Sequence, residues 1–338
     1  MKAWQLTAHG DARKVLALRE LPDPSPKPGE VLISSEGFGL NYADVMAVKG
    51  LYRDAPPPPC VLGYETVGRV ERCGEGVSAE WLGKRVVAMT RFGGYAELVS
   101  TDHRAMAEIP DEMGIGEAAA MATQGATAWY MSMLRWPVHE GMRVLVHSAA
   151  GGVGQLLTQI AVHQRCEVFA VAHGTEKMAY LKQLGAQHII DRKSGDYAEQ
   201  LQKLLGKERL DVSFNAVGGT TFKKDLGLLG SGGAVVLFGG AERGAGGAFG
   251  TLRFAWNMGL VIPIFLMMQC KSLVGVNMLR LSEQRPLTVT ACMKGALGAM
   301  REGWLKPRVD QVFASEELPQ ALELLGSGKS IGKVVVKW

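Results

Sequence analysis

A short glycine-rich stretch has the residue types and spacing that suit an anion. Residues 146–155 read VHSAAGGVGQ and lie between a strand-like run, 143–147, and a helix-like run, 155–164. Dinucleotide-binding turns follow the pattern Gly-x-Gly-x-x-Gly, and Ala149, Gly151 and Gly154 stand in that register. A bare backbone lets a pyrophosphate approach, and a helix start offers unpaired N–H groups. We therefore predict phosphate contacts from residues Ala150, Gly151, Gly152, Val153 and Gly154; a glycine turn without a ligand is the alternative.

The residues after the next strand bear on which dinucleotide binds. Sites for NAD usually carry Asp or Glu at this strand tip, about 20 residues beyond the glycine turn. Here the run 167–173 is followed by Gly174, Thr175 and Lys177, and the tip itself has no acid. Small, hydroxyl and basic residues suit a 2′-phosphate, so we predict NADPH rather than NADH. The predicted contacts are His173, Gly174, Thr175, Lys177 and Arg192, and a solvated Lys177 is the alternative.

The elements around these residues alternate between strand and helix from about residue 123. Such alternation is typical of right-handed βαβ units and a parallel sheet. Residues 1 to about 122 instead read as short strands separated by Gly, Pro and Asp. The predicted strands of the alternating part are 143–147, 167–173, 188–190, 211–215, 234–238 and 273–277, and the last sixty residues predict helices at 287–302 and 318–326 and a strand at 333–337.

Length and composition restrict the class of protein. A chain of 338 residues is long enough for two domains, and 47% hydrophobic with 21% charged residues is typical of a globular protein. The net charge of +4 is mild and no Lys/Arg block occurs, so no nucleic acid partner is expected. The five cysteines are far apart, without CxxC pairs, and the first ten residues lack the apolar core of a signal peptide. We predict a reduced, cytoplasmic protein.

One uncharged segment, residues 254–270, has several interpretations. It reads FAWNMGLVIPIFLMMQC and is close to the lower length limit of about 17 residues for a membrane span. Asn257, Pro263 and Gln269 argue against a span. An apolar wall over a substrate pocket and a buried subunit contact are favoured, and loose attachment to a membrane surface stays open.

Several stretches carry a family resemblance along essentially the whole chain. They are GLNYADVMAVKGLY (39–52), GYETVGRVERCGEGV (63–77), GKRV (83–86), GGYAELV (93–99), ATQGATAWYMS (122–132), VLVHSAAGGVGQ (144–155) and LKQLGA (181–186). In these the sequence resembles the zinc-free quinone oxidoreductase branch of the medium-chain dehydrogenase/reductase family. The stretch 256–279 is similar to the vesicle amine transport protein homologue subgroup of that branch.

The resemblance implies an α/β fold of two domains. A GroES-like, β-rich catalytic domain would be split between residues 1–122 and 279–338. A Rossmann domain with a doubly wound parallel sheet would occupy 123–278 and bind NADPH. In this family the nicotinamide and substrate lie between the two domains. Related quinone oxidoreductases join Rossmann sheets edge to edge, so the resemblance also implies a homodimer or tetramer, with the strand 273–277 as the contact.

The resemblance further implies that no metal is bound. The two catalytic zinc ligands of the alcohol dehydrogenases correspond here to Asn41 and Tyr64, and neither is a usual zinc ligand. Without a Lewis acid, a simple alcohol is a poor hydride donor. A quinone or an α,β-unsaturated carbonyl compound accepts a hydride readily and is the better substrate. We therefore expect an NADPH-dependent reductase of a small hydrophobic quinone or enone. An enoyl-thioester reductase and a non-enzymatic, NADPH-bound, membrane- or lipid-associated protein are the alternatives.

Site residues follow from the same resemblance. Asn41, Tyr52 and Tyr64 are expected to donate hydrogen bonds to a carbonyl or ribose oxygen, and a purely space-filling Tyr64 is the alternative. Asp44 is expected to fix its loop, and Glu65 to be a buried partner of a neighbouring group. Lys333 is expected to reach the cofactor phosphates, with a strand-edge lysine as the alternative. The remaining expected cofactor contacts are Asn41, Thr127, Phe238, Gly239, Gly240 and Asn277.

Overall fold

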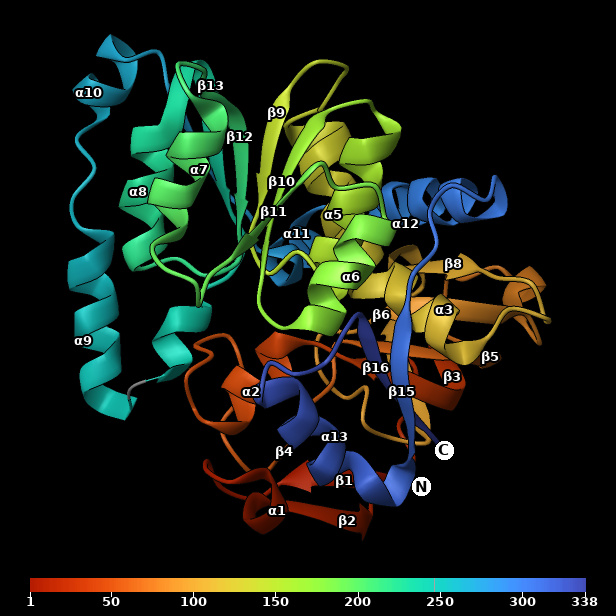
Figure 1. The fold of residues 1–338 in the computed structure, drawn as a ribbon. Helices are drawn as coiled ribbons and strands as arrows, with labels where there is room; N and C mark the ends of the chain where they lie inside the picture. The colour runs from red at the N-terminus through yellow and green to blue at the C-terminus, as the bar shows by residue number, and fades with distance from the viewer. Residues whose placement is uncertain (246) are drawn as a thin grey trace. The chain divides into compact units, whose positions relative to one another are not determined.

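The computed structural model describes residues 1–245 and 247–338 and divides the chain into two units (Figure 1). The first unit consists of Met1–Trp129, Met278–Gly303 and Pro307–Trp338, and the second of Tyr130–Asn277 and Trp304–Lys306. The domain limits predicted from the sequence, 1–122 with 279–338 and 123–278, stay a prediction. Each unit is described by itself below.

The second unit contains the predicted parallel sheet. Its strand order is β11 (His188–Asp191), β10 (Glu167–Ala172), β9 (Arg143–Val146), β12 (Leu210–Asn215), β13 (Leu229–Leu237) and β14 (Ser272–Gly275). All five neighbouring pairs are parallel. The chain order reverses between β9 and β12, and ligands of such sheets bind beyond the carboxyl ends of the strands at this point. The predicted α/β class is confirmed.

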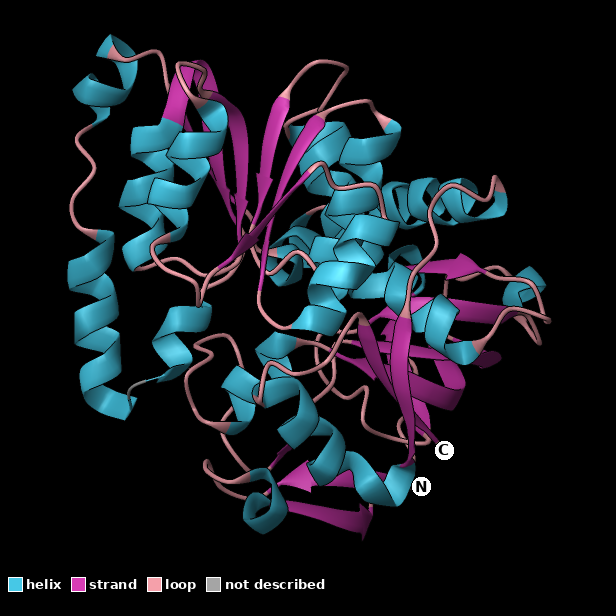
Figure 2. Cartoon of the chain, in the orientation of Figure 1, coloured by secondary structure: helices cyan, strands magenta, loops and turns pink. Residues whose placement is uncertain are grey.

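Helices cover both faces of this sheet (Figures 1 and 2). On one face lie α5 (Gly152–His163) and α6 (Thr175–Gln183), and on the other α7 (Tyr197–Leu205) and α8 (Thr220–Leu228). Leu201 and Phe222 from the second pair pack on Leu145 and Phe169 of the sheet, and all four side chains are buried. This core holds the carboxyl ends of β9 and β12 in place.

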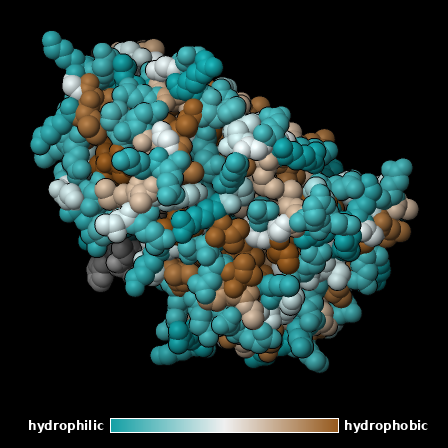
Figure 3. Space-filling model, turned by 45° about the vertical axis from the view of Figure 1, so that its right-hand side comes forward, coloured by the Kyte–Doolittle hydropathy of each residue, from teal (hydrophilic) through white to brown (hydrophobic). Residues whose placement is uncertain are grey.

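The uncharged segment, 254–270, contains the end of helix α9 (Gly247–Met258) and the whole of α10 (Pro263–Met268), and both helices lie outside α8 (Figure 1). No helix in the described part of the chain is both long and apolar enough to cross a membrane. Several apolar side chains of this segment face solvent: Trp256 is 84%, Leu260 87% and Met268 71% exposed. Ile262 and Phe265 also line a pocket together with Phe222 of α8, so the pocket-wall, subunit-contact and membrane-surface interpretations all stay predictions. In the view of Figure 3, hydrophobic groups form patches on a largely hydrophilic surface.

The first unit is rich in β structure. A seven-stranded sheet has the order β15 (Val309–Ala314), β16 (Lys333–Lys337), β3 (Glu30–Leu40), β5 (Glu65–Cys73), β6 (Arg85–Met89) and β8 (Met106–Glu108), and β7 (Leu98–Asp102) also pairs with β3. A smaller sheet has the order β2 (Leu16–Glu20), β1 (Lys2–Leu6) and β4 (Cys60–Val61). The helices of this unit are α1 (Ala12–Val15), α2 (Tyr42–Val48), α3 (Ile115–Ala120), α4 (Ala126–Trp129), α11 (Met278–Gln284), α12 (Pro286–Arg301) and α13 (Leu318–Gly326).

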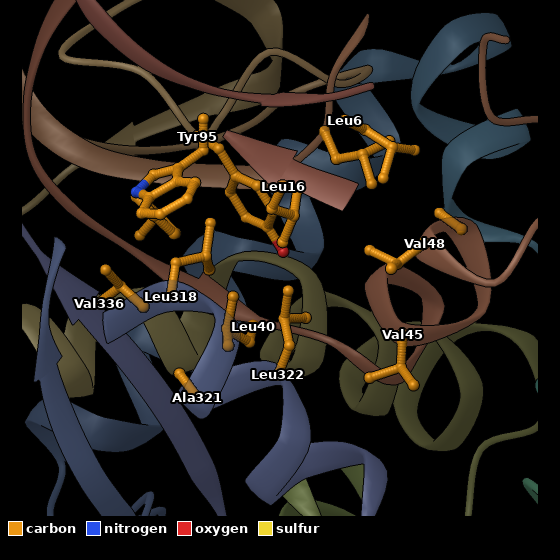
Figure 4. Packing of buried hydrophobic residues seen from close by; sticks show 14 of the residues in the cluster. Leu6, Leu16, Leu40, Val45, Val48, Tyr95, Leu318, Ala321, Leu322 and Val336 are labelled. Carbon is orange, nitrogen blue, oxygen red and sulfur yellow. The ribbon is translucent and has the colours of Figure 1, made fainter. Parts of the chain in front are cut away.

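One apolar core fixes the start of α2 against the sheets of this unit. Figure 4 shows Leu40 and Val45 with Tyr95, Leu318 and Leu322, which come from β3, α2, a loop and α13. Leu40 ends β3, and Asn41 follows it as the N-cap of α2. The packing of Leu40 and Val45 on either side therefore holds Asn41 in a defined place.

Two further features bring distant residues to Asn41. Strand β16 pairs antiparallel with β3 and sets Val334 opposite Leu40, so that Lys333 comes beside Asn41. A π-helical turn, Met121–Gly125, joins α3 to α4 and carries Thr123 and Gln124. Such turns leave backbone groups displaced from the regular helical pattern and are frequent at functional sites.

Candidate active site

One residue in the glycine turn of the second unit has a left-handed backbone conformation. Ser148 has φ +51°, whereas Ala149, at the place of the first motif glycine, is not among the residues with positive φ. An alanine is therefore tolerated there. At position 154 a glycine is required for lack of space, because a Cβ there would lie 2.3 Å from the Ser148 carbonyl oxygen and 2.8 Å from the Ala149 Cα. The third glycine thus allows α5 to pack directly on the turn.

Helix α5 presents its first amides beyond this turn. The amide of Gln155 makes the first intrahelical bond, to the Gly151 carbonyl at 2.9 Å. The amides of Gly152, Val153 and Gly154 come before that bond, where a helix has no acceptor of its own for them. Small side chains leave these N–H groups accessible to an anion, and the helix dipole favours negative charge. The predicted phosphate contacts therefore occupy one helix start.

The predicted 2′-phosphate residues lie at the tips of β10 and β11. His173 and Gly174 follow β10, and Gly174 has φ +99°, which only glycine adopts easily. Thr175 is the first residue of α6 and is exposed, and Lys177 in the same first turn is half-buried. Arg192, directly after β11, is exposed. All five belong to the second unit, and their contact with a phosphate stays a prediction.

An acid missed by the sequence reasoning lies among these residues. Asp191 ends β11, and its Oδ1 is 2.9 Å from His173 Nδ1 and 3.0 Å from the Lys193 amide. Its other oxygen accepts a hydrogen bond from Ser194 Oγ at 2.9 Å. The Lys193 amide, followed by His173, lowers the pKa of Asp191 to about 2. The carboxylate is thus engaged by the chain itself, and no local pattern near β10 pointed to it.

A buried polar hub under the glycine turn was also missed. Asp225 of α8 is fully buried and accepts hydrogen bonds from Ser213 Oγ (2.7 Å), Tyr197 OH (2.7 Å) and Asn215 Nδ2 (2.6 Å). His147 Nε2, directly before the turn, lies 2.9 Å from its Oδ2. Burial raises the pKa of Asp225, but the charge and hydrogen bond of His147 and the other donors outweigh burial and lower it.

This hub supports the loops at the carboxyl ends of β9 and β12. Asn215 Oδ1 accepts the amides of Val217 (2.9 Å) and Gly218 (2.8 Å). Its backbone carbonyl accepts the amide of Phe238 at 3.1 Å. A Cβ on Gly239 would lie 2.5 Å from the Ala216 carbonyl oxygen, so this glycine allows the two loops to approach closely.

The remaining predicted cofactor residues of this unit lie after strands. Phe238, Gly239 and Gly240 follow β13, which ends at Leu237. The expectation that Asn277 ends a strand is wrong, because β14 ends at Gly275 and Asn277 is exposed beyond it. Within the described residues, β14 is the last strand of its sheet and pairs with β13 alone.

In the first unit, Asn41 is held by two donors. Its Oδ1 accepts a hydrogen bond from Lys333 Nζ at 3.2 Å and from Gln124 Nε2 at 3.2 Å. Its backbone amide donates to Asp44 Oδ2 at 2.7 Å, which agrees with the loop-fixing role expected of Asp44. Asn41 is only 6% exposed, and its Nδ2 has no hydrogen-bond partner in the described part of the chain.

Lys333 and Glu65 form a fully buried ion pair, in which Lys333 Nζ contacts Glu65 Oε1. Glu65 Oε2 also accepts the amide of Thr123 at 2.9 Å, from the π-helical turn. A Cβ on Gly39 would lie about 2 Å from both side chains, at 2.1 Å from Lys333 Cε and 2.2 Å from Glu65 Oε1. Glu65 is thus the buried partner that the sequence predicted.

The structure decides one of the two expectations for Lys333. The strand-edge alternative is wrong, because β16 lies between β15 and β3. The ammonium group is paired inside the first unit and fully buried, and its predicted contact with the cofactor phosphates stays a prediction. Burial of an ammonium group is costly unless it is paired and hydrogen-bonded, and Glu65 and Asn41 supply both.

Two phenols are protonated donors in the same unit. Tyr64 is 3% exposed, and its hydroxyl has no hydrogen-bond partner among the described residues. Burial, followed by the charge of Asp44, raises its pKa. Tyr52 is half-buried, its ring meets that of Tyr64 edge to face at 5.8 Å, and burial raises its pKa to about 12. Both hydroxyls therefore keep their protons at neutral pH.

Thr127 points its hydroxyl into its own helix. Its Oγ1 donates to the Thr123 carbonyl at 2.5 Å, and the residue is 6% exposed. Because its hydrogen is used in this bond, Thr127 Oγ1 can accept a hydrogen bond from a ligand. Its predicted contact with the nicotinamide stays a prediction.

No set of three or more His, Cys, Asp or Glu side chains is gathered to hold a metal ion within residues 1–245 and 247–338. Asn41 and Tyr64, at the positions of zinc ligands in the alcohol dehydrogenases, are instead a hydrogen-bonded amide and a buried phenol.

Two family models match the chain. The alcohol dehydrogenase GroES-like domain matches residues 27–140, and the zinc-binding dehydrogenase model matches residues 152–288. The first match lies in the β-rich part and the second begins at the start of α5.

Individual proteins are similar over nearly the whole chain. The human synaptic vesicle membrane protein VAT-1 homolog-like is 31% identical, over 99% of this chain and 80% of its own length. A solved mycobacterial protein complexed with NADPH is 29% identical with a TM-score of 0.88, covering 100% of both chains. A quinone oxidoreductase of Pseudomonas syringae is 26% identical with a TM-score of 0.88, covering 100% of this chain and 99% of that one. The chain therefore belongs to the medium-chain dehydrogenase/reductase family, with similarity to VAT-1 homologues and quinone oxidoreductases.

Proposed function

We propose that the protein is an NADPH-dependent, zinc-independent oxidoreductase that reduces a quinone or an α,β-unsaturated carbonyl compound. The observation that carries the proposal is the glycine turn, whose small residues lead into the unpaired first amides of α5. The relative solved with NADPH supports the choice of cofactor. Lys177 and Arg192 are the cations that we assign to the 2′-phosphate. Ala150 to Gly154 are assigned to the pyrophosphate.

The chemistry divides between the cofactor and the chain. Bound NADPH would supply the hydride. Asn41, Tyr52 and Tyr64 would donate hydrogen bonds to oxygen, and such donors stabilise the negative charge that develops on a quinone or enone oxygen. With the pKa of Tyr52 raised to about 12, the phenols act as donors rather than as bases. The proton can come from water, because the conjugated oxygen spreads the charge before it is protonated.

The first test is NADPH oxidation in the presence of EDTA, with ortho-quinones, para-quinones and enones as acceptors and NADH alongside. We expect turnover with NADPH, little with NADH and no loss on chelation. An enoyl thioester in the same panel tests the alternative acceptor class. Inhibition by EDTA that is restored by Zn²⁺ would overturn the metal-independent mechanism, and NADPH binding without turnover of any acceptor would overturn the reductase function.

A second candidate function rests on the apolar surface of α9 and α10. In it the protein binds NADPH as a structural ligand and associates with lipid. Trp256 and Leu260, more than four-fifths exposed, favour it because soluble monomers rarely expose neighbouring large apolar groups. Liposome flotation tests it: binding that survives high salt and does not depend on NADPH would support this function over the reductase.

We further propose that the protein is a cytoplasmic homodimer formed through β14 and the apolar segment beside it. All five cysteines are free thiols, as in a reducing compartment. Strand β14 is the last strand of its sheet, and edge strands tend to pair with another chain unless they are protected. A second copy would extend the sheet and cover the exposed side chains of α10.

A further inference from the structure

The orientation of the Asn41 amide is determined by a chain of donors and acceptors. Gln124 Nε2 lies 3.3 Å from the Leu40 carbonyl, which only accepts, so that Gln124 must present its NH₂ group on this side. The same nitrogen is 3.2 Å from Asn41 Oδ1, which therefore has to be the oxygen of that amide. The Leu40 carbonyl thus determines the orientation of the Gln124 side-chain amide, which in turn determines that of the Asn41 side-chain amide.

Lys333 gives the same answer independently. An ammonium group only donates hydrogen bonds, and Lys333 Nζ is 3.2 Å from Asn41 Oδ1. Glu65 pairs with the same ammonium group and itself accepts a hydrogen bond from the Thr123 amide. Both neighbours of the Asn41 amide therefore require its oxygen, and rotation of the amide by 180° would place NH₂ against two donors.

The consequence is a buried NH₂ group without an internal acceptor. Asn41 Nδ2 has no hydrogen-bond partner among the described residues, although Asn41 is only 6% exposed. An unsatisfied buried donor loses its hydrogen bonds to water without replacement, so such a group needs an explanation. A ligand oxygen that arrives at Nδ2 would satisfy it.

We propose that Lys333 and Gln124 are positioning residues that hold the Asn41 amide with its NH₂ group ready to donate to a ligand oxygen. This inference rests on the proposed function, because the ligand is taken to be NADPH or its carbonyl acceptor. The amide recognises a hydroxyl or carbonyl oxygen and rejects a group that can only donate. Lys333 acts through Asn41, so its burial and pairing are part of the binding site for that oxygen.

The first experiment separates the two atoms of the amide by comparing Asn41→Asp with Asn41→Ala. Aspartate keeps oxygens for Lys333 and Gln124 but has no NH₂ group, whereas alanine has neither. Stability should therefore depend on the side-chain oxygen. In protein without NADPH, the unfolding temperature of Asn41→Ala should be several degrees below that of Asn41→Asp. Binding and turnover should depend on the NH₂ group, which neither variant has. At pH 8 both variants should therefore lose at least tenfold in NADPH affinity or in kcat/KM.

A pH profile gives a signature that packing alone would not produce. Protonation of the new carboxyl group restores an O–H donor, so the activity of Asn41→Asp relative to wild type should rise as the pH falls, while that of Asn41→Ala stays flat. Loss of NADPH affinity assigns the oxygen to the cofactor, and an unchanged NADPH Kd with a lower kcat/KM assigns it to the acceptor. Wild-type binding and turnover in Asn41→Asp at pH 8 would overturn the donor role.

The positioning role of Lys333 is tested without leaving a buried charge unpaired. The double variant Lys333→Met with Glu65→Gln removes both charges, and Lys337→Met, an exposed position on the same strand, is the matched control. We expect at least a tenfold loss of NADPH affinity or kcat/KM in a folded double variant and no change in the control. A folded double variant with wild-type values would overturn the positioning role.

The outcomes distinguish this inference from the proposed function. If wild-type protein neither binds nor oxidises NADPH, the proposed function fails, and the stability comparison in NADPH-free protein still decides the amide orientation. If Asn41→Asp is as unstable as Asn41→Ala, the orientation is wrong even where the enzyme is active.

Discussion

Buried hydrogen-bond donors dominate the chemistry of the first unit. Tyr64 and the Asn41 NH₂ group are buried, and neither has an internal acceptor in the described residues. Donors held in place before the reaction cost little reorganisation when charge develops on a ligand oxygen. In the proposed reaction, the oxygen of a conjugated carbonyl compound gains such charge as the hydride arrives.

We propose that single residues in the second unit decide the choice between NADPH and NADH. Lys177→Ala is expected to weaken NADPH binding tenfold or more and leave NADH binding unchanged. A hydrogen bond to a charged group contributes about 1.5–3 kcal/mol, and about 1.4 kcal/mol corresponds to tenfold in affinity. Fluorescence titration with both cofactors measures this, and Lys182→Ala, exposed on the same helix, is the control. Equal losses for NADPH and NADH would remove Lys177 from the phosphate site.

Asp44 makes stability depend on pH. Burial raises its pKa from 3.8 to about 7, against the hydrogen bond from the Asn41 amide, with Glu65 raising the pKa and Lys333 lowering it. Between these values the unfolded chain releases the proton and the folded chain keeps it, so ionisation favours unfolding as the pH rises. Asp44→Asn should therefore gain stability relative to wild type by up to about 1.4 kcal/mol per pH unit between about pH 4 and 7.

Urea unfolding of both proteins at several pH values measures this difference. A constant offset between the two curves would show that Asp44 ionises normally. If Asp44→Asn gained stability relative to wild type only above pH 7, this result would contradict the raised pKa of Asp44.

At the scale of elements, the turn between β9 and α5 combines two constraints. The Gly154 position has no room for a side chain, and the amides before Gln155 must remain accessible. The Asp225 hub holds His147 immediately before the turn and Asn215 at the end of β12. Buried networks with every partner satisfied rigidify their surroundings, so this hub keeps the turn and its neighbouring loop in one geometry.

Two glycine substitutions in helices should have opposite signs. Gly154→Ala forces the Cβ to within 2.3 Å of a backbone oxygen, so we expect a loss of about 1–3 kcal/mol and much weaker NADPH binding. A Cβ on Gly298, in α12, would meet no described atom of another element within 4 Å, so Gly298→Ala should gain about 0.5–1 kcal/mol of stability. Urea unfolding measures both. A neutral Gly154→Ala would show that the turn can shift, and the close-packing role of this glycine would be withdrawn.

At the scale of the whole molecule, the surface of α9 and α10 is the main feature that a single chain does not explain. Leu252, Trp256, Leu260, Met267 and Met268 are all at least 70% exposed. A second copy of the chain or a lipid surface would remove this apolar area from water. The proposed homodimer uses it together with the edge strand β14.

The double variant Trp256→Glu with Leu260→Glu should separate these assemblies. Because both side chains are solvent-exposed in one chain, the variant should fold normally, within about 0.5 kcal/mol per site. Light scattering after size exclusion should show wild type near twice the 36.4 kDa of one chain and the variant near that value. A variant that remains dimeric would place the contact elsewhere, and wild type that is already monomeric would exclude the homodimer.

Much of the fold could be predicted from local patterns. The run 318–326 and the final strand 333–337 have the limits that the sequence predicted, because apolar periodicity and flanking turn residues define them. The segment 254–270 was harder, because its lack of charge is compatible with a pocket wall, a subunit contact and a membrane surface. Its exposure depends on how far α9 and α10 lie from the sheet, which no local pattern records.

The sequence by itself determined the glycine turn, the alternation of strand and helix and the lack of an acid at the tip of β10, since each depends on neighbouring residues. Only the tertiary structure decided the partners of the buried charges. Lys333 and Asn41 are 292 residues apart and meet because β16 pairs with β3, and His147 and Asp225 are 78 residues apart. A charge is stable in a protein interior only beside a compensating group, and which group is near follows from strand pairing and helix packing across the whole chain.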